Sequence, residues 1–372
     1  MRRTLFGAEH ERFRAVVRRF FDEEVVPQYA DWAMDGRPPR EFWRGAARAG
    51  ILGIGVPKEW GGLAHSTFRH SAVVSEEAQR AGLALGGVRV HTDICMPYFL
   101  RFGSAEQIAR WVPRLTAGEA VVALALSEPG AGSDLKSMTT RAQLDGDHYV
   151  VDGAKTFISN GAAADLIVLA VKTTPDAGRN GISLLVVEAD TPGFTRGRKL
   201  DKLGLHSQDL AELLFSQMRV PRDNLLGEQD AGFGYLTSNL AQERLSIAVS
   251  AQAAAVAVLD RATAQIAHKP GQRVKFAMAS SHAEVAAGQA LIDESIAAHE
   301  ADELTPADAA VAKLFCTELQ GRVTQRCVDV LGTDALRTDS FVGQSLLDGR
   351  VTRIFGGSSE IMRVLVAQSM DL

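Results

Sequence analysis

The sequence predicts an α+β protein in which a β region lies between two helical regions. Three changes in hydrophobic periodicity support this prediction. Apolar residues recur every three or four positions from residue 1 to about 120, short β-rich runs follow, and helical spacing returns after about residue 229. We therefore expect three domains, 1–120, 121–228 and 229–372, with a cleft where the helical domains meet the β domain.

The N-terminal region begins with a predicted amphipathic helix. Phe13, Val16, Val17 and Phe20 lie at helical spacing, and charged residues interrupt every apolar stretch. This pattern differs from that of a signal peptide, which has an unbroken apolar core. We find no internal repeat and no apolar run of membrane-spanning length.

The middle region contains short β-rich runs bounded by Gly, Asp and Pro. They read VVALAL, HYVVDG, DLIVLAV and GISLLVVEA, and the region ends at 221–227. Such runs predict a compact sheet or barrel.

The C-terminal region contains one unusual carboxylate, Glu243. It lies on a stripe that steps by three and four residues and is otherwise apolar. The members of this stripe are Phe233, Leu236, Leu240, Glu243, Ile247, Ala251, Ala254 and Val258. A lone carboxylate on a buried stripe is costly unless it is paired or used. Pairing with a cation such as Arg244 and a functional role both remain open on this pattern.

Composition limits the classes of function. The chain has 372 residues, a formal net charge of −5 and three scattered cysteines without CxxC spacing. The slight acidity argues against nucleic acid as a partner, and the cysteines fit a reducing cytoplasm without a zinc or dithiol site. We expect no metal and no membrane partner.

Three small-residue segments could approach a ligand closely. SEPGAGSD at 127–134 forms a loop after a predicted strand, and KTFISNG at 155–161 ends another strand with an aromatic and a hydroxyl. Exposed amides in the first loop suit a planar or phosphorylated ligand, although a plain tight turn is the alternative. This loop is neither a P-loop nor a GxGxxG fingerprint.

The third segment, GGSSE at 356–360, contains a second candidate carboxylate, Glu360. The glycine pair indicates a positive φ or a close approach. Ser358 or Ser359 suits a helix N-cap, and Glu360 would then lie in the first turn, where the helix dipole stabilises it. On pattern alone, a structural role is favoured for Glu360.

Together these segments resemble the acyl-CoA dehydrogenase family nearly from end to end. FGSAEQ (102–107), LTAGE (115–119), SEPGAGSD, KTFISNG, KLDKLGLHSQD (199–209), VPRDNLLGE (220–228) and RVTRIFGGSSEIMR (350–363) occur in the family's order. The resemblance implies an N-terminal α domain, a middle β-barrel or sheet domain and a C-terminal four-helix bundle. It also implies an FAD-dependent enzyme that converts acyl-CoA to trans-2-enoyl-CoA.

The resemblance assigns roles to particular residues. Ser127 would contact the pyrimidine edge of FAD, Phe157 would flank the ring system, and Ser159 would lie near flavin N5. The implied cofactor contacts are Leu124, Ser127, Gly132, Ser133, Phe157, Ile158, Ser159, Gln272, Ser358 and Glu360. The implied substrate contacts are Ser133, Arg244 and Gly357.

The resemblance also indicates the catalytic base. Many family members have a Glu directly before the glycine that matches Gly357, but this chain has Gly356 there. The long-chain and isovaleryl types place the base on a C-terminal helix just before an Arg, which matches Glu243. Removal of a weakly acidic thioester α-proton requires a carboxylate whose pKa is raised by an apolar pocket. We therefore expect Glu243 to be the base.

Two departures from the family pattern concern the flavin. The family's RxxFG stretch, which meets the FAD of a neighbouring subunit, is replaced by a segment around Lys269, and its QxxGGxG reads DVLGTDA around Gly332. We therefore expect weaker FAD retention than in typical relatives.

Several functional alternatives remain open. A carrier-protein-linked acyl dehydrogenase, a flavin monooxygenase on the same scaffold and an auxiliary subunit with weakened flavin binding are the other interpretations. For the favoured enzyme we expect electron-transfer flavoprotein as electron acceptor and a homodimer or homotetramer.

Overall fold

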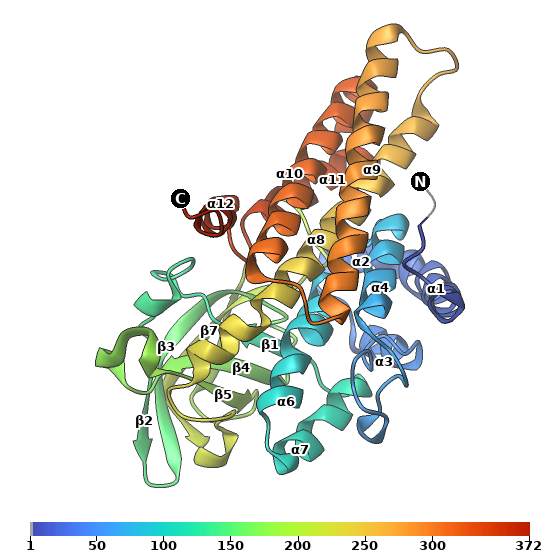
Figure 1. Cartoon of the computed structure of the whole chain (residues 1–372). Coiled ribbons are helices and arrows are strands. Elements are labelled where there is room, and N and C mark those ends of the chain that lie inside the picture. Colours follow the sequence, from blue (N-terminus) through green and yellow to red (C-terminus); the bar gives the residue numbers. More distant parts are fainter. Residues whose placement is uncertain (1–2) are drawn as a thin grey trace.

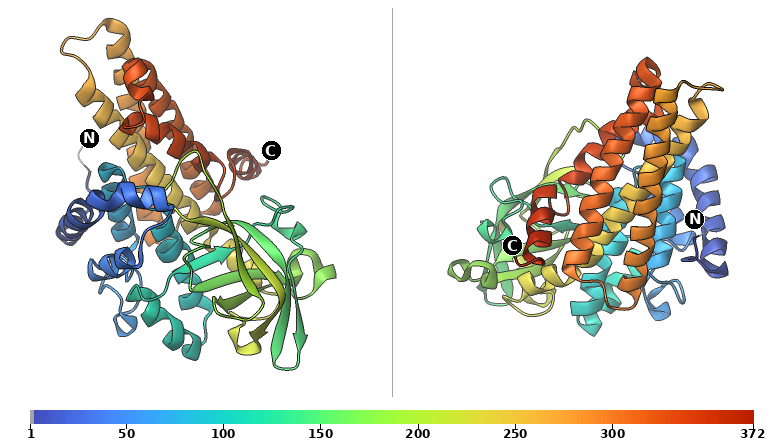
Figure 2. Two further views of the ribbon diagram at one scale, coloured as in Figure 1. Left: turned by 180° about the vertical axis from the view of Figure 1, so that it is seen from behind. Right: turned by 45° about the horizontal axis from the view of Figure 1, so that its top comes forward.

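The computed structural model describes residues 3–372 and has helices, then a sheet, then long helices along the chain. The predicted order of a helical region, a β region and a second helical region is confirmed. Figure 1 shows the β region beside the N-terminal helices, with the long C-terminal helices extending away from both. The views in Figure 2 show the same separation.

The N-terminal region is built from short helices. They are α1 (Ala8–Phe20), α2 (Tyr29–Asp35), α3 (Arg40–Arg48), α4 (Phe68–Ala81), α5 (Gly86–Arg89), α6 (Met96–Phe102) and α7 (Ala105–Thr116). In α1 the apolar face is buried at Phe13, Val17 and Phe20, which confirms the predicted amphipathic helix. A π-helical turn, Val90–Cys95, joins α5 to α6.

The β region is one seven-stranded sheet with the order β1-β4-β2-β3-β7-β6, in which β5 pairs with β4. The strands are β1 (Val122–Ala125), β2 (Arg141–Asp145), β3 (His148–Ser159), β4 (Leu166–Lys172), β5 (Ile182–Glu188), β6 (Phe194–Lys199) and β7 (Leu210–Pro221). Alternate residues of β4 enter two different cores: Leu166 and Val168 pack with helical residues, and Ile167 and Leu169 pack inside the β region. Burial on both faces explains the unbroken apolar run of this strand.

The C-terminal region contains α8 (Gly232–Gln265), α9 (Gln272–Glu300), α10 (Pro306–Leu331), α11 (Phe341–Gly349) and α12 (Ser359–Gln368). By length and composition, α8 could cross a membrane, so the expectation that no run reaches that length is wrong. However, 78% of its most apolar window is buried inside the protein. This helix is the core element of the C-terminal region, which explains why most of its surface is apolar.

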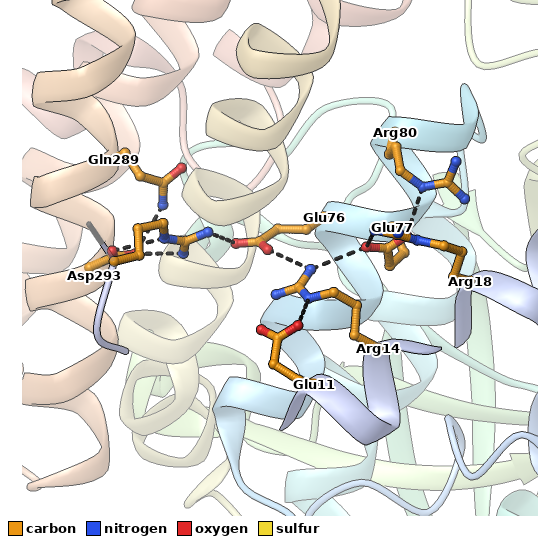
Figure 3. Close-up of polar contacts among 9 residues, drawn as sticks. Glu11, Arg14, Arg18, Glu76, Glu77, Arg80, Gln289 and Asp293 are labelled. Carbon is orange, nitrogen blue, oxygen red and sulfur yellow. Dashed lines mark hydrogen bonds and ion pairs between the residues drawn. The ribbon is translucent and has the colours of Figure 1, made fainter. Parts of the chain in front are cut away.

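An ion-pair network attaches the N-terminal region to α9 (Figure 3). Arg3 bonds Asp293 of α9 at 2.7 Å and Glu76 of α4 at 2.9 Å. Arg14 of α1 contacts Glu76 at 2.8 Å and the buried Glu77 at 3.2 Å. Because α4 also packs on α8, these contacts hold the N-terminal helices against the helix that carries Glu243.

Candidate active site

The Glu243 carboxylate is buried between the N-terminal and C-terminal regions. The side chain is 8% exposed. Tyr98 Oη, on α6, donates to Glu243 Oε1 at 2.9 Å, and Asn239 Nδ2, one helical turn earlier on α8, donates to the same oxygen at 3.1 Å. Within residues 3–372, no Lys, Arg or His side-chain nitrogen lies within 4.0 Å of this carboxylate.

This environment raises the pKa of Glu243. Removal of the carboxylate from water raises its pKa, and the bonds from Tyr98 and Asn239 oppose this shift only in part. Arg244, the next residue, exerts a smaller opposing effect, since it forms no ion pair with Glu243. Burial lowers the pKa of Arg244, and its buried Nε has no hydrogen-bond partner. Pairing with Arg244 is therefore not what keeps Glu243 buried.

The glycine pair forms a turn against the same face of α8. Gly356 has φ +63° and Gly357 has φ +94°, a region that residues with a Cβ rarely adopt. A Cβ placed on Gly356 would overlap Cδ1 of Ile247, which lies one helical turn after Glu243. Buried Lys313 of α10 donates to the Gly357 carbonyl at 2.7 Å. These contacts place the turn beside α8, close to the stripe that carries Glu243.

Glu360 has a different environment. It is exposed in the first turn of α12, whose N-cap is Ser358, as the sequence predicts. Its backbone N–H and the Ser358 hydroxyl lower its pKa. A carboxylate with this environment is a poor general base, so the structural interpretation of Glu360 fits the geometry.

The two small-residue segments of the β region lie side by side. Thr156 N donates to Ser127 O at 2.9 Å. A buried ion pair also joins them, because Lys155 Nζ bonds Glu128 Oε1 at 2.9 Å and Leu126 O at 2.9 Å. Glu128 Oε2 accepts a hydrogen bond from the backbone N–H of Thr139. Glu128 Oε1, which also bonds Lys155, accepts one from the backbone N–H of Thr140. The loop that follows β1 is thereby fixed to the end of β3.

These segments leave a surface that fits a planar ring system. Phe157 has φ +57° and is 66% exposed, so its aromatic face is available for stacking. A Cβ at Gly130 or Gly132 would meet nothing within 4 Å, which leaves the loop backbone open to a ligand. The Ile158 side chain is buried in the β core, so only its backbone could contact a cofactor. The residues present therefore fit a flavin.

The remaining predicted contacts divide into two groups. Leu124, Ser127 and Ser159 are half-buried and Ser133 is exposed around the flavin surface, whereas Gln272 is exposed at the first residue of α9. Figure 1 shows the α8–α9 connection, which contains Lys269, at the end of the bundle farthest from the β region. Within one chain, Gln272 is thus separated from the other candidates.

A cleft that is open to solvent adjoins the flavin surface and the glycine turn. Gln208 lines it and donates to Ser159 Oγ at 3.2 Å, and Phe355, directly before Gly356, lines it as well. Along α8 the wall continues through Ala251 and Ala254, beyond Glu243, which is not part of this wall.

Of the segment 88–97, only Val88 and Arg89 line the cleft. His91 is fully buried and its Nε2 lies 3.2 Å from Leu115 O. It is therefore a hydrogen-bonded core histidine.

Comparison with known proteins identifies the scaffold. The chain matches the models of the acyl-CoA dehydrogenase N-terminal domain (residues 7–119), middle domain (residues 123–218) and C-terminal domain (residues 230–370). The chain belongs to the acyl-CoA dehydrogenase family. It is an enzyme of this family, whose members are FAD-dependent, which confirms the predicted cofactor.

Individual relatives cover almost the whole chain. The mitochondrial long-chain specific acyl-CoA dehydrogenase of Sus scrofa is 37% identical over 99% of this chain and 88% of its own length. A crystal structure of an acyl-CoA dehydrogenase from Geobacillus kaustophilus has a TM-score of 0.96 and 40% identity, with 99% of each chain covered. A glutaryl-CoA dehydrogenase from Mycobacterium smegmatis in complex with FADH2 has a TM-score of 0.90 and 25% identity over 98% of this chain and 95% of that one. These relatives support acyl-CoA dehydrogenation as the reaction of this family member.

Proposed function

We propose that this enzyme oxidises an acyl-CoA to the trans-2-enoyl-CoA with Glu243 as the base that removes the α-proton. One observation carries the assignment: Glu243 is a buried carboxylate with no cationic partner among residues 3–372, and its pKa is raised by burial. A raised pKa makes the carboxylate a stronger base, which abstraction of a weakly acidic proton requires.

The residues around Glu243 have distinct roles in this proposal. Tyr98 and Asn239 hold one carboxylate oxygen, which leaves the second oxygen to take the α-proton. Gly356 and Gly357 have no side chains of their own, which would allow the thioester to approach the backbone of this turn. Lys313 fixes this turn through the Gly357 carbonyl. Phe157 and Ser159 would hold FAD, which would supply the acceptor for the β-hydride.

The proposal is tested by Glu243→Gln. The variant keeps an oxygen that can accept from Tyr98 and Asn239 but loses the base, so we expect reduction of the flavin by acyl-CoA to slow at least about a hundredfold. The measurement is anaerobic bleaching of bound FAD. Glu360→Gln is the matched control and should bleach at nearly the wild-type rate. Wild-type bleaching without oxygen also argues against a monooxygenase.

If Glu243→Gln bleaches within a few-fold of the wild type while its FAD spectrum is unchanged, the base is another group. If no acyl-CoA bleaches the flavin of wild-type enzyme loaded with FAD, the proposed reaction itself is wrong. A carrier-protein thioester in place of CoA would distinguish the carrier-linked alternative.

We also propose electron-transfer flavoprotein as the electron acceptor, a homodimer or homotetramer as the assembly, and the cytoplasm as the compartment. The family resemblance supports the first two. The relatives include a mitochondrial enzyme as well as proteins from bacteria, and the bacterial ones support the third.

A further inference from the structure

The cleft beyond Glu243 contains an arginine that the proposed reaction does not use. Arg89 ends α5 and lines the cleft. Its Nη1 donates to the Ser246 carbonyl of α8 at 3.2 Å, and this is the one hydrogen bond that the guanidinium makes to residues 3–372. Across the same residues, no carboxylate oxygen lies within 4.0 Å of it. The other donors of this cleft residue therefore have no partner among residues 3–372.

The nearest acidic groups are already engaged. Asp93 attracts Arg89 at longer range, but its carboxylate accepts hydrogen bonds from the hydroxyls of Ser71, Thr92 and Ser246. The second acidic residue of the cleft wall, Asp348, accepts from the Leu205 backbone and from Gln344. Neither carboxylate forms an ion pair with Arg89, so a ligand could supply the missing anion.

Arg89 is half-buried, and burial lowers its pKa. A charged group that is partly removed from water gains from a counter-charge or from further hydrogen bonds. Beside it, Gln79 Nε2 donates to Ser250 Oγ at 3.3 Å, and both residues line the cleft among mostly apolar neighbours. An unsubstituted hydrocarbon chain would cover the remaining donors of Arg89 without satisfying them.

The position of Arg89 sets the distance between a ligand's anion and the reacting carbon. The Arg89 bond is to the carbonyl of Ser246, three residues after Glu243, and helix carbonyls point toward the C-terminus. With a rise of about 1.5 Å per residue, the guanidinium lies roughly 5–7 Å further along α8 than the base. An extended chain advances about 1.2 Å per bond. The group that meets Arg89 would be about four to six bonds from the α-carbon.

The path between the two sites is continuous in the fold. Asn160 Nδ2, at the end of the flavin segment, donates to the Gly87 carbonyl of α5 at 2.9 Å. Gly86 lies directly against Gln208 of the cleft wall. The short helix that carries Arg89 is thus docked on the flavin surface, while Val88 and Ala251 supply apolar wall for intervening methylenes.

We propose that Arg89 is a specificity residue that binds a carboxylate at the far end of the acyl chain, so that the preferred substrates are CoA thioesters of medium-length dicarboxylic acids. Arginine binds carboxylate through two parallel hydrogen bonds, which fixes both distance and orientation. The proposal rests on the acyl-CoA oxidation proposed above and adds the chemistry of the acyl end.

The test compares matched thioesters. Hexanoyl-CoA and octanoyl-CoA are paired with the mono-CoA thioesters of adipic and suberic acid, and kcat/KM is measured for each. We expect the wild type to prefer the carboxylated member of a pair. Arg89→Met should lower kcat/KM for the carboxylated members about 10- to 150-fold, as expected for loss of hydrogen bonds between charged groups, and should lower that for the unsubstituted members far less. Arg89→Lys should retain part of the preference.

A second measurement does not depend on turnover. Adipyl-CoA and hexanoyl-CoA are titrated calorimetrically into FAD-loaded Glu243→Gln enzyme with and without Arg89→Met, and the ratio of their Kd values should fall in the Arg89→Met background. Arg101→Met, which removes an exposed arginine on α6, is the matched control and should leave the ratio unchanged.

Failure of this proposal differs from failure of the reaction. Suppose that hexanoyl-CoA or octanoyl-CoA bleaches the flavin but the enzyme shows no preference for the carboxylated thioester in turnover or in binding. This outcome would overturn the role of Arg89 and leave the proposed reaction intact. An equal loss for both members of a pair in Arg89→Met and Arg89→Lys would also overturn it, because a structural role affects both. If no thioester bleaches the flavin, a Kd ratio that is the same with and without Arg89→Met overturns the binding role as well.

Discussion

Glu128 and Glu243 are both buried glutamates, at 6% and 8% exposure, yet their acidities shift in opposite directions. Burial disfavours the charge of both. At Glu128 the bonds from Thr140, Thr139 and Lys155 outweigh burial and lower the pKa to about 2. At Glu243 burial outweighs two neutral donors and raises the pKa. Burial therefore does not decide the acidity of a carboxylate; its partners do.

The difference corresponds to different tasks in the two regions. Glu128 joins the loop after β1 to the end of β3, and a proton on it would weaken the contacts that hold the flavin surface. Glu243 has no cation to lose, so it can take up a proton without breaking an ion pair. A fixed charge suits a scaffold, whereas a weakly compensated charge suits proton transfer.

The largest effect is expected in the free energy of unfolding of two matched variants. Glu128→Gln leaves the ammonium group of Lys155 buried without its counter-charge, so we expect a loss of about 3–5 kcal/mol in the free energy of unfolding. Glu243→Gln removes a poorly compensated charge and keeps both hydrogen bonds, so stability should be unchanged or slightly higher. Chemical denaturation at pH 7, followed by far-UV circular dichroism, measures both.

The pH dependence of this difference follows from the direction of each shift. The folded-state pKa of Glu128 lies below its ordinary value of 4.5, so its stabilisation is present above pH 4.5 and is lost as the pH falls toward 2. The gap between wild type and Glu128→Gln should therefore narrow below pH 4.5. Equal stability of Glu128→Gln and wild type at pH 7 would show that Lys155 needs no counter-charge.

A smaller expected effect concerns the pH at which flavin reduction is lost on the acid side of the pH profile. Tyr98→Phe removes one of the two donors that lower the pKa of Glu243, so this pKa should rise further. A hydrogen bond to a charged group contributes about 1.5–3 kcal/mol, which corresponds to roughly one to two pH units. The base acts when deprotonated, so flavin reduction in Tyr98→Phe should be lost at a higher pH than in wild type and recover in alkaline buffer.

The pH profile of kcat/KM for anaerobic reduction measures this shift. Tyr149→Phe, which removes a hydroxyl bonded to Gln229 in the β region, serves as control and should keep the wild-type profile. An unshifted acid limb in Tyr98→Phe would mean that the titrating group is not Glu243.

The sequence identifies some parts of this site and not others for physical reasons. Helical periodicity singles out Glu243 because its neighbours on the stripe are local in sequence. Tyr98 is far from Glu243 in sequence, and its contact depends on how α6 packs on α8, which periodicity does not encode. Asn239 could have been noticed, since it lies one turn before Glu243. Arg89 looks like an ordinary helix residue until the cleft is known.

The buried ion pair shows the same limit. Glu128 and Lys155 lie within the two motifs that the sequence singles out, but it is the folded sheet that brings these motifs together, as the hydrogen bond from Thr156 N to the Ser127 carbonyl shows. The fold class, by contrast, follows from the change between helical and strand periodicity, which is a local property of each region.

The smallest expected effect is a rescue that tests whether Glu243 and the glycine turn share a target. In a Glu243→Ala background, Gly356→Glu would supply a carboxylate from the opposite wall. The added Cβ would overlap Ile247 Cδ1, and φ at this position is +63°, so the double variant is strained. Adding Ile247→Ala removes the overlap but not the backbone strain. We expect the triple variant to bleach FAD faster than Glu243→Ala with Ile247→Ala, although well below the wild-type rate. A folded, FAD-loaded triple variant that is no faster than this control would show that the two positions do not reach the same substrate carbon.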